Sequence, residues 1–511
     1  MSFGGSFVTG GSGAASPVIL EPSLTMSEPI PLSELTASLA RAEVHGDPSV
    51  LVTDVAYRSA EVRPGALFFC VPGVNVDGHA FAGEAEARGA AAAAVERWLE
   101  VGCPQVLVPS VRRAMGPMAA AVFRHPSREL TVVGVTGTNG KTTTTYLMES
   151  IFRASGSRAG VIGTTGVRID GVPVPFDRTT PEAPDLQRLL RRMAGDGIGA
   201  VAMEVSSHGL HQHRVDGCRF TCAVFTNLSQ DHLDYHGSME EYFAAKARLF
   251  TPALSERGVV NGDTAEGRAL AVSGQVPVVT FGLGPDVDVR AEAVEVTPQG
   301  LSFRARGLSV RSPLRGHFNV YNCLGALAAA RLLGIGGDAI VEGIGALAGV
   351  PGRLEPVEAG QPFTVLVDYA HTPDGIDNVL GAARKLTSGQ VLVVFGCGGD
   401  RDRGKRPLMG EAATRKADLA VVTSDNPRSE EAEAIIAEIV PGAERGGGRF
   451  VVEPDRRAAI RLALVEALPG DVVVIAGKGH ETGQQFADVT IPFDDRVVAA
   501  EELAALQEAG R

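Results

Sequence analysis

The stretch Gly134-Val-Thr-Gly-Thr-Asn-Gly-Lys-Thr-Thr143 directly follows a short apolar run and decides the fold of the chain. A strand that enters a glycine-rich turn ending in Gly-Lys-Thr lets backbone N–H groups converge on phosphates. In this pattern Lys141 neutralises phosphate charge and Thr142 offers a hydroxyl to Mg²⁺. The spacing is unusual, because Val135 stands where the first glycine is expected. Residues 142–154 contain neither glycine nor proline, as a following helix requires. The sequence therefore predicts a nucleoside triphosphate site.

Composition and charge indicate the broad class of protein. The chain has 511 residues, of which 44% are hydrophobic and 21% charged, as in a soluble globular protein of about three domains. A net charge of −13 argues against nucleic acid as the main partner, because phosphate backbones bind basic surfaces. The six cysteines are scattered without C-x-x-C spacing, which suits a reducing compartment. We therefore expect a cytoplasmic protein.

The first 29 residues differ from the rest of the chain. They are rich in glycine and serine and lack the basic start and apolar centre of a signal peptide. The sequence contains no run of about 18 apolar residues, the length that a membrane-spanning helix needs. We expect residues 1–29 to form a disordered extension and the protein not to insert into a membrane.

Apolar runs alternate with helical patterns along the remaining chain, which predicts the α/β class. Changes in the pattern divide it into blocks at 30–129, 130–351 and 352–511. In the central block, residues 291–311 alternate in polarity and suggest a small antiparallel sheet, and an alanine-rich helix is expected at 320–333. Continuous apolar runs, typical of parallel strands buried on both faces, occur at 131–135, 200–204 and 222–226.

The third block resembles a second open α/β sheet, in which ligands bind beyond the carboxyl ends of the strands. Strands are expected at 363–367, 391–395, 419–423, 450–452 and 472–476. Polar motifs follow four of these strands, at Asp368, residues 396–401, residues 425–428 and residues 477–481. This placement predicts a second small-molecule site.

Several central residues have both a chemical and a structural interpretation. Glu204 ends an apolar strand, where a carboxylate either holds Mg²⁺ or makes a surface hydrogen bond. His208 and His211 are expected to be structural or to position substrate. His232, Asp234 and His236 form an H-x-D-x-H pattern, but without a further ligand spacing a zinc site is disfavoured.

Lys246 lies in an otherwise apolar helical segment, where a lysine usually extends its ammonium group to solvent. The alternative is a desolvated neutral amine that takes up CO₂ to form a carbamate.

The polar motifs of the third block are also ambiguous. Asp368 suits either a ribose contact or a helix N-cap. Residues 396–407 hold four cations and two anions, as in a solvated loop or an anion site. Asp425-Asn-Pro-Arg428 pairs a carboxylate with a guanidinium, which suits either an amino-acid grip or an ordinary turn.

Taken together, these motifs resemble those of the Mur ligase family, and the resemblance runs from about residue 30 to the C-terminus. The unusual first glycine is this family's form of the loop. The motifs are Thr136-Gly-Thr-Asn-Gly-Lys-Thr-Thr143, Glu204-Val-Ser-Ser-His208, Asp231-His-Leu-Asp234, Gly316-His-Phe-Asn-Val-Tyr-Asn322, Asp368-Tyr-Ala-His-Thr-Pro373 and Asp425-Asn-Pro-Arg428.

The resemblance implies three domains: a UDP-binding α/β domain (30–129), a central P-loop-type ATPase domain (130–351) and a C-terminal Rossmann-like domain (352–511). It implies a monomer that uses ATP and Mg²⁺ to join meso-2,6-diaminopimelate to the D-Glu γ-carboxylate of UDP-MurNAc-L-Ala-D-Glu through an acyl phosphate. The chain departs from the family at Arg58-Ser59-Ala60, where Asp-Ser-Arg is usual, so only Ser59 carries over there.

The resemblance also implies the roles of individual residues. Catalytic roles fall to Lys141, Glu204, carbamylated Lys246 and His232, and the metal ligands are Thr142, Glu204, Lys246 and His232. ATP contacts fall to Gly137, Thr138, Asn139, Gly140, Lys141, Thr142, Thr143, Asn322, Arg353 and Asp368. The UDP-linked substrate is implied to contact Ser59, Val74, Asn75, Val76, Thr179, Thr180, Ser206, Gln212 and Arg214. Diaminopimelate is implied to contact Arg401, Asp425, Asn426, Pro427, Arg428, Gly477 and Glu481.

Three alternatives stay open. A lysine-adding ligase of the same family is disfavoured by the Asp425–Arg428 turn, and a folylpolyglutamate synthase by the full N-terminal block. A nucleotide-dependent regulator that performs no ligation would tolerate loss of Lys141, Glu204 or Lys246, and all three are present.

Overall fold

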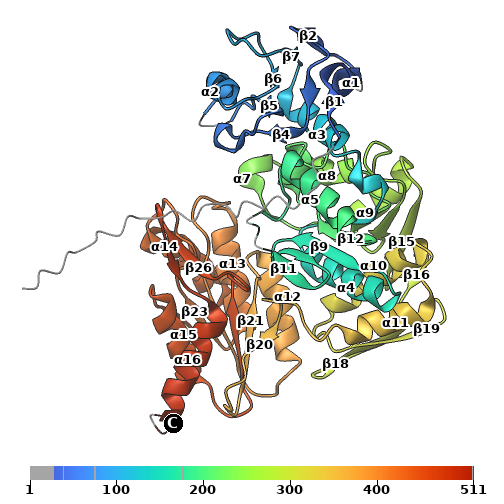
Figure 1. The fold of residues 1–511 in the computed structure, drawn as a ribbon. Helices are drawn as coiled ribbons and strands as arrows, with labels where there is room; N and C mark the ends of the chain where they lie inside the picture. Colours follow the sequence, from blue (N-terminus) through green and yellow to red (C-terminus); the bar gives the residue numbers. More distant parts are fainter. Residues whose placement is uncertain are drawn as a thin grey trace, which may run out of the picture.

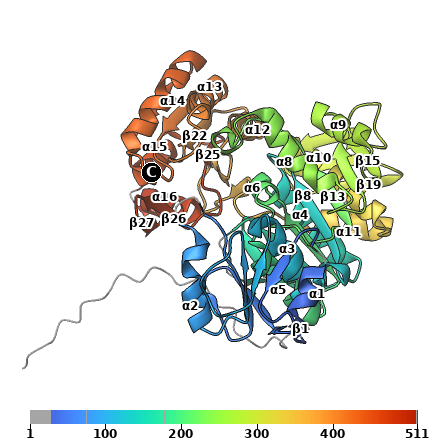
Figure 2. The same cartoon turned by 90° about the horizontal axis from the view of Figure 1, so that it is seen from above.

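The computed structural model describes residues 28–37, 39–73, 76–174, 176, 178–508 and 510. The extension expected at residues 1–29 therefore lies outside the described residues, apart from its last two positions. Figure 1 shows three lobes, with the N-terminal lobe in blue above a green-to-yellow central lobe and the C-terminal lobe in orange and red beside it. Figure 2 shows the same lobes from above. In the described part of the chain, no helix is long and apolar enough to cross a membrane.

The N-terminal lobe is built on a five-stranded sheet of order β2-β7-β6-β5-β4, parallel except for the β2–β7 pair. Alternate side chains pack on opposite faces: Leu67 and Phe69 face α1 and α3, whereas Phe68 faces α2. The strands are β2 (Glu43–His45), β4 (Asp54–Ala56), β5 (Ala66–Phe69), β6 (Ala92–Val95) and β7 (Gln105–Leu107); β1 (Ile30–Pro31) pairs separately with β3 (Leu51–Val52). The helices are α1 (Leu32–Ala37), α2 (Ala82–Ala87) and α3 (Val111–Val122).

The central lobe contains a nine-stranded sheet of order β11-β10-β9-β12-β8-β13-β14-β15-β16, parallel from β9 to β16. Val133 and Val135 face α4 and α10, whereas Val132 packs with α5 on the other face, so both faces are buried as the apolar runs predicted. The strands are β8 (Thr131–Thr136), β9 (Ala159–Gly163), β10 (Gly166–Ile169), β11 (Val172–Val174), β12 (Ala200–Glu204), β13 (Cys222–Phe225), β14 (Gly258–Asn261), β15 (Val278–Gly282) and β16 (Val289–Arg290).

The helices of this lobe and its small second sheet complete the core. The expected antiparallel excursion is the three-stranded sheet β17 (Glu292–Thr297), β18 (Gly300–Ala305) and β19 (Leu308–Ser312). The helices are α4 (Lys141–Ala154), α5 (Ala183–Gly195), α6 (Ser207–His211), α7 (Leu233–His236), α8 (Met239–Ala247), α9 (Ala265–Ser273), α10 (Phe318–Leu332) and α11 (Gly337–Ala346).

The C-terminal lobe has a six-stranded sheet of order β20-β21-β25-β22-β23-β24, parallel except for its edge strand β20. Helices α12, α13 and α14 cover one face, and α15 and α16 cover the other. The strands are β20 (Glu355–Pro356), β21 (Thr364–Asp368), β22 (Val391–Phe395), β23 (Leu419–Val422), β24 (Phe450–Val452) and β25 (Val472–Ala476), followed by the hairpin β26 (Gly483–Phe486) and β27 (Val489–Pro492). The helices are α12 (Pro373–Arg384), α13 (Lys405–Lys416), α14 (Ala432–Gly446), α15 (Arg456–Glu466) and α16 (Asp495–Glu508).

A fully buried ion pair connects two helices of the C-terminal lobe to the ends of two strands of its sheet. Arg456 donates to both carboxylate oxygens of Asp495, at 2.8 and 2.7 Å. Its guanidinium also donates to the carbonyl oxygens of Ser424 (3.1 Å) and Ala476 (3.0 Å), which lie just after β23 and at the end of β25. The pair therefore links the first residues of α15 and α16 to the sheet edge where polar motifs gather.

We predict that Arg456→Met lowers the free energy of unfolding by about 3–5 kcal/mol, because it leaves the Asp495 carboxylate buried without its partner. Arg415→Met removes an exposed pair with Asp377 on the same lobe and should cost about 0–1 kcal/mol. Urea unfolding followed by circular dichroism tests this, and equal midpoints for the two variants would contradict it.

Candidate functional site

The phosphate loop lies between β8, which ends at Thr136, and α4, which begins at Lys141. Two of its glycines have positive φ, 146° at Gly137 and 84° at Gly140. A side chain at Gly137 would collide with the Thr226 hydroxyl, and one at Gly140 would collide with Asn322 Oδ1. The loop thus needs glycine both for backbone conformation and for close packing. Asn322, which is expected to contact ATP, therefore lies directly against the loop.

Two lysines share one backbone carbonyl of this loop. Lys141 Nζ donates to the carbonyl oxygens of Gly137 (3.1 Å) and Thr138 (2.8 Å). Lys246 Nζ, from α8, donates to the same Gly137 oxygen at 2.8 Å. The Lys246 side chain is buried and lies 4.4 Å from the Tyr242 ring centroid. Burial, reinforced by the Lys141 charge, holds the pKa of Lys246 well below its usual value. Lys246 therefore does not extend its amine to solvent.

Glu204 stands next to the phosphate loop because its strand, β12, pairs in parallel with β8, with Glu204 opposite Val135. The side chain is buried, and both carboxylate oxygens accept hydrogen bonds from Thr164. Oε1 accepts from the Thr164 backbone N–H at 2.9 Å, and Oε2 from its hydroxyl at 3.0 Å. Glu204 is thus not a surface residue. Its carboxylate is held in place by Thr164, which follows β9.

His232 lies where the central sheet meets the C-terminal lobe. Its backbone is left-handed, with φ 56°, just before the short helix α7. The ring lies 3.3 Å from Asp231 Oδ2 and packs 4.7 Å from His208. Burial lowers the pKa of His232 to about 2, so the ring is neutral and has a nitrogen lone pair available. His236 instead packs on Tyr242.

The donors around the loop fit a hard divalent cation such as Mg²⁺. Thr142 and Glu204 supply oxygens, and His232 supplies a neutral nitrogen. Within the described residues, however, no three His, Cys, Asp or Glu side chains are grouped so that they could hold a metal ion. The remaining oxygen ligands of a bound Mg²⁺ would come from water, substrate phosphates or a modified side chain. Lys246, whose buried amine has a lowered pKa, is the residue that suits such a modification.

The remaining expected ATP residues come from the C-terminal lobe. Arg353 Nη2 donates to Thr142 Oγ1 at 2.8 Å, and its guanidinium lies 4.6 Å from the Tyr369 ring centroid. Asp368 accepts from the backbone N–H groups of Leu354 (2.7 Å) and Ala370 (2.8 Å). The N-cap interpretation of Asp368 is wrong, because Thr372 caps α12 by accepting from Gly375 N. Asp368 instead fixes the turn that leads to that helix.

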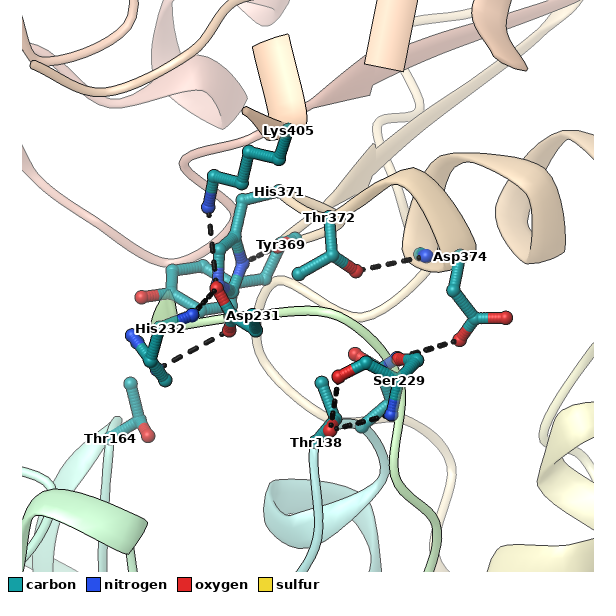
Figure 3. Close-up of polar contacts among 12 residues, drawn as sticks. Thr138, Thr164, Ser229, Asp231, His232, Tyr369, His371, Thr372, Asp374 and Lys405 are labelled. Carbon is teal, nitrogen blue, oxygen red and sulfur yellow. Dashed lines mark hydrogen bonds and ion pairs between the residues drawn. The ribbon is translucent and has the colours of Figure 1, made fainter. Parts of the chain in front are cut away.

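Figure 3 shows how the central and C-terminal lobes meet at the loop that precedes His232. Lys405 and His371 point toward Asp231, with their nitrogens 3.4 and 3.7 Å from its carboxylate. On the same loop the Ser229 hydroxyl donates to Asp374 Oδ2 at 3.4 Å. Although burial alone would raise the pKa of Asp231, hydrogen bonding to His371 and the charge of Lys405 hold it well below its usual value. A buried carboxylate thus joins the two lobes.

The residues expected to bind the UDP-linked substrate fall into two groups. In the central lobe the Thr180 hydroxyl donates to Glu204 O (2.9 Å), and the Ser206 hydroxyl caps α6 by accepting from Gly209 N. Thr179 contacts Thr164, Gln212 donates to the Tyr235 hydroxyl, and Arg214 donates to Gln212 and Thr180. In the N-terminal lobe, Ser59 donates to Glu84 (2.9 Å) and Val76 is exposed, whereas Val74 and Asn75 lie outside the described residues.

The residues expected to bind the amino acid gather at the carboxyl ends of β22, β23 and β25. Gly477 has φ 116°, and a side chain there would meet Asp425 Oδ2. Arg428 Nη1 donates to Gly399 O at 2.7 Å, and burial together with the neighbouring Arg401 lowers the pKa of its guanidinium. Asn426 donates to Glu481 Oε2 at 2.8 Å. Pro427 precedes the left-handed Arg428. Two cations and two carboxylates therefore surround one strand-end site.

Three residues that this geometry makes important are not predictable from the local sequence. Thr164 binds Glu204 and Thr179, and its carbonyl accepts from His480 of the C-terminal lobe at 3.0 Å. Lys405 lies within the cation-rich stretch 396–407. The sequence shows its charge but does not show that its partner is Asp231. Lys478 lies between Gly477 and Glu481 in the motif at residues 477–481, but no role was predicted for this lysine. Thr164 and Lys405 act through contacts distant in sequence, whereas Lys478 combines one distant contact, with Asn426, with local contacts to Glu481 and Gly483.

Comparisons with known proteins agree with this arrangement. Family models match the chain at residues 51–124 (Mur ligase family, catalytic domain), 135–330 (Mur ligase middle domain) and 352–479 (Mur ligase, glutamate ligase domain). A Geobacillus thermodenitrificans protein is 48% identical over 481 residues, which covers 92% of this chain and 98% of that protein. The chain belongs to the Mur ligase family.

The relatives of this Mur ligase carry a specific name. The Geobacillus protein and a Streptomyces coelicolor protein, 48% identical over 93% of this chain and 97% of its own, are both named UDP-N-acetylmuramoyl-L-alanyl-D-glutamate–2,6-diaminopimelate ligase. A solved structure with that name is 36% identical, with a TM-score of 0.66 over 94% of this chain and 100% of its own. A Thermotoga maritima MurF ligase solved in complex with ADP shares the fold, with 20% identity and a TM-score of 0.62 over 89% of this chain and 97% of its own.

We predict that Lys405→Met weakens the association of the two lobes, because Asp231 loses its neighbouring cation. We expect a larger radius of gyration by small-angle scattering and a loss in kcat/KM of roughly 10- to 100-fold. Arg403→Met removes an exposed cation two residues away, which pairs with Glu438, and serves as the control. An unchanged scattering curve and unchanged kinetics for Lys405→Met would contradict the prediction.

Proposed function

We propose that this Mur ligase uses ATP to join meso-2,6-diaminopimelate to the D-Glu γ-carboxylate of UDP-N-acetylmuramoyl-L-alanyl-D-glutamate, a step in peptidoglycan precursor synthesis. The observation that carries the proposal is the closeness of two sites. Arg353 of the C-terminal lobe donates to Thr142 of the phosphate loop, and His480, next to Glu481, contacts Thr164 beside Glu204. A phosphate site and a zwitterion site facing each other suit a ligase that joins two substrates through a phosphorylated intermediate. The relatives' shared name supports the choice of substrates.

In the first step the γ-carboxylate of the bound dipeptide attacks the γ-phosphorus of ATP, ADP leaves, and an acyl phosphate forms. The loop N–H groups and Lys141 bind the phosphates and offset their charge. Thr179, Thr180 and Arg214 line the central lobe near Glu204 and orient the dipeptide. Asn322, Arg353 and Asp368 surround the other end of the loop and position the nucleotide.

Lys246 provides an anion at this site after reaction with CO₂. The neutral amine attacks the carbon of CO₂, an N–C bond forms, one N–H proton is released, and the product is a carbamate. This reaction needs a low pKa at Lys246, because only the unprotonated amine has a lone pair. Burial beside Lys141 lowers the pKa of Lys246. Glu204, Thr142, His232 and the carbamate would together hold Mg²⁺, which offsets negative charge on the transferred phosphoryl group.

In the second step the unprotonated amine of diaminopimelate attacks the acyl carbon, the bond from that carbon to the phosphate oxygen breaks, and the amide forms as one N–H proton leaves with the phosphate. Arg401 and Arg428 bind the carboxylate of the far amino-acid head, which lysine lacks. Asp425 and Glu481 bind its ammonium group. The lobe contacts at Asp231 and Thr142 bring this site to the phosphate loop and keep water from the reactive intermediate.

The proposal is tested by incubating the protein with ATP, Mg²⁺, the UDP-linked dipeptide and either diaminopimelate or L-lysine, and by weighing the product. We expect diaminopimelate to be preferred by about 10⁴-fold in kcat/KM, because lysine leaves the arginines unpaired. Arg428→Ala should raise the KM for diaminopimelate far more than the KM for ATP. Comparable kcat/KM values for both amino acids would support a lysine-tolerant ligase, and ATP hydrolysis without any ligated product would support a regulatory ATPase.

We predict that Lys246→Ala lowers kcat by about 100-fold or more, since the site loses an anion that electrostatic stabilisation depends on. Added formate or acetate should restore part of the activity by supplying a carboxylate in the vacated space. Lys385→Ala, at an exposed lysine, should have no effect. Full activity of Lys246→Ala, or an unmodified Lys246 amine in well-resolved electron density of active enzyme, would count against the carbamate.

We infer further that the enzyme acts as a monomer in the cytoplasm, where ATP is supplied. Each of its proposed sites is lined by residues of this one chain, so no second copy is needed to complete them. Sedimentation of the active enzyme tests the oligomeric state.

A further inference from the structure

Lys478 is a buried cation inside the amino-acid site that the proposed mechanism does not use. It follows β25 directly after Gly477, and its side chain has no exposed surface. Removing an ammonium group from water is costly unless the protein supplies close polar partners. A lysine held at this position therefore calls for an explanation.

The ammonium group has three donors, and each has a partner. Nζ donates to Asn426 Oδ1 at 2.9 Å, to Glu481 Oε2 at 3.0 Å and to the carbonyl oxygen of Gly483 at 2.6 Å. Since three hydrogen bonds saturate an ammonium group, Lys478 has no donor left for a substrate. It contacts the residues that line the site rather than any molecule bound there.

Two of these partners are residues expected to contact the amino acid. Asn426 also donates to Glu481 Oε2 at 2.8 Å and accepts from Gln485 N at 3.0 Å. Oε2 of Glu481 thus receives two hydrogen bonds, whereas Oε1 receives none from the residues that the structure describes. The Glu481 side chain is 31% exposed, and Oε1 is the carboxylate oxygen that these hydrogen bonds leave available.

We propose that Lys478 is a positioning residue for the incoming amino acid: it holds Asn426 and Glu481 in one arrangement, with Glu481 Oε1 left to bind the substrate ammonium group. This inference rests on the proposed function of the C-terminal site. The pair Asn426–Glu481 would otherwise have several rotamers, because a glutamate side chain with an exposed end is flexible. The positive charge also offsets the repulsion between Glu481 and Asp425, which lie in the same site.

Lys478→Met tests the proposal, because methionine fills similar volume without any donor. We expect the KM for diaminopimelate to rise by roughly 10- to 100-fold, as for the loss of hydrogen bonds to a charged group. The KM values for ATP and for the UDP-linked dipeptide should not change, and kcat should stay within about threefold. Lys416→Met removes another lysine of the same lobe, which pairs with Asp377 at 2.6 Å, and should leave all three KM values unchanged.

A double-mutant cycle separates positioning from general loss of stability. If Lys478 acts through Glu481, then Lys478→Met should add little to the KM increase that Glu481→Gln causes alone. Independent, multiplicative effects of the two substitutions would overturn the proposal, as would an unchanged KM in Lys478→Met. If Glu481→Gln and Arg428→Ala also leave the KM for diaminopimelate unchanged, then the amino-acid site itself, and with it this part of the proposed function, is wrong.

A second measurement does not depend on the variant folding. In a crystal structure of the unmodified enzyme with diaminopimelate, Glu481 Oε1 should lie within hydrogen-bond distance of a ligand ammonium group, and Lys478 Nζ should keep its three protein acceptors. A ligand bound by Glu481 Oε2, or one that contacts Lys478 directly, would overturn the proposal.

Discussion

The site depends on the two lysines that share the Gly137 carbonyl oxygen. Two ammonium groups beside one acceptor repel each other, and because Lys246 is buried, solvent screens this repulsion only weakly. The arrangement becomes favourable when one of the two loses its charge or turns into an anion. Lys141 belongs to the phosphate loop, whereas Lys246 lies buried on α8. The carbamate proposed above would make Lys246 the group that changes. Glycine at 137 is a condition for this contact, because a side chain there would displace the loop.

The positions of the other groups follow from the parallel sheets. Parallel strands place all their carboxyl ends at one edge, so Glu204 stands beside the phosphate loop and Asp425 stands beside Gly477. The two edges face each other, and buried polar contacts hold them there: Asp231 with Lys405, and Thr142 with Arg353. Ligation of two substrates requires such closeness, because the acyl phosphate must meet the amine before water does.

Much of this arrangement could be predicted from the sequence. Strands buried on both faces have continuous apolar runs, which is why β8, β12, β22 and β25 could be located closely. Short strands are harder to locate: the apolar stretch at residues 51–56 is divided between β3 and β4, which belong to different sheets. Asp368 was expected to contact a ribose or to cap a helix. The cap is excluded, since Thr372 caps α12, and the Asp368 carboxylate accepts two backbone N–H groups, while the ribose contact stays a prediction. Local sequence cannot distinguish these partners, since an aspartate after a strand suits all of them.

By itself the sequence determined the α/β class, the phosphate loop and the residues that follow each strand, because these depend on local periodicity and on the glycines that a turn requires. The family resemblance added roles for those residues, including Lys246. Only the tertiary structure decided which charges meet: Asp231 with Lys405, Arg456 with Asp495, and Lys478 with Asn426 and Glu481. The reason is physical. The cost of burying a charge and the partner that offsets it depend on distances across the fold, and most of these partners are separated by tens of residues or more in the chain.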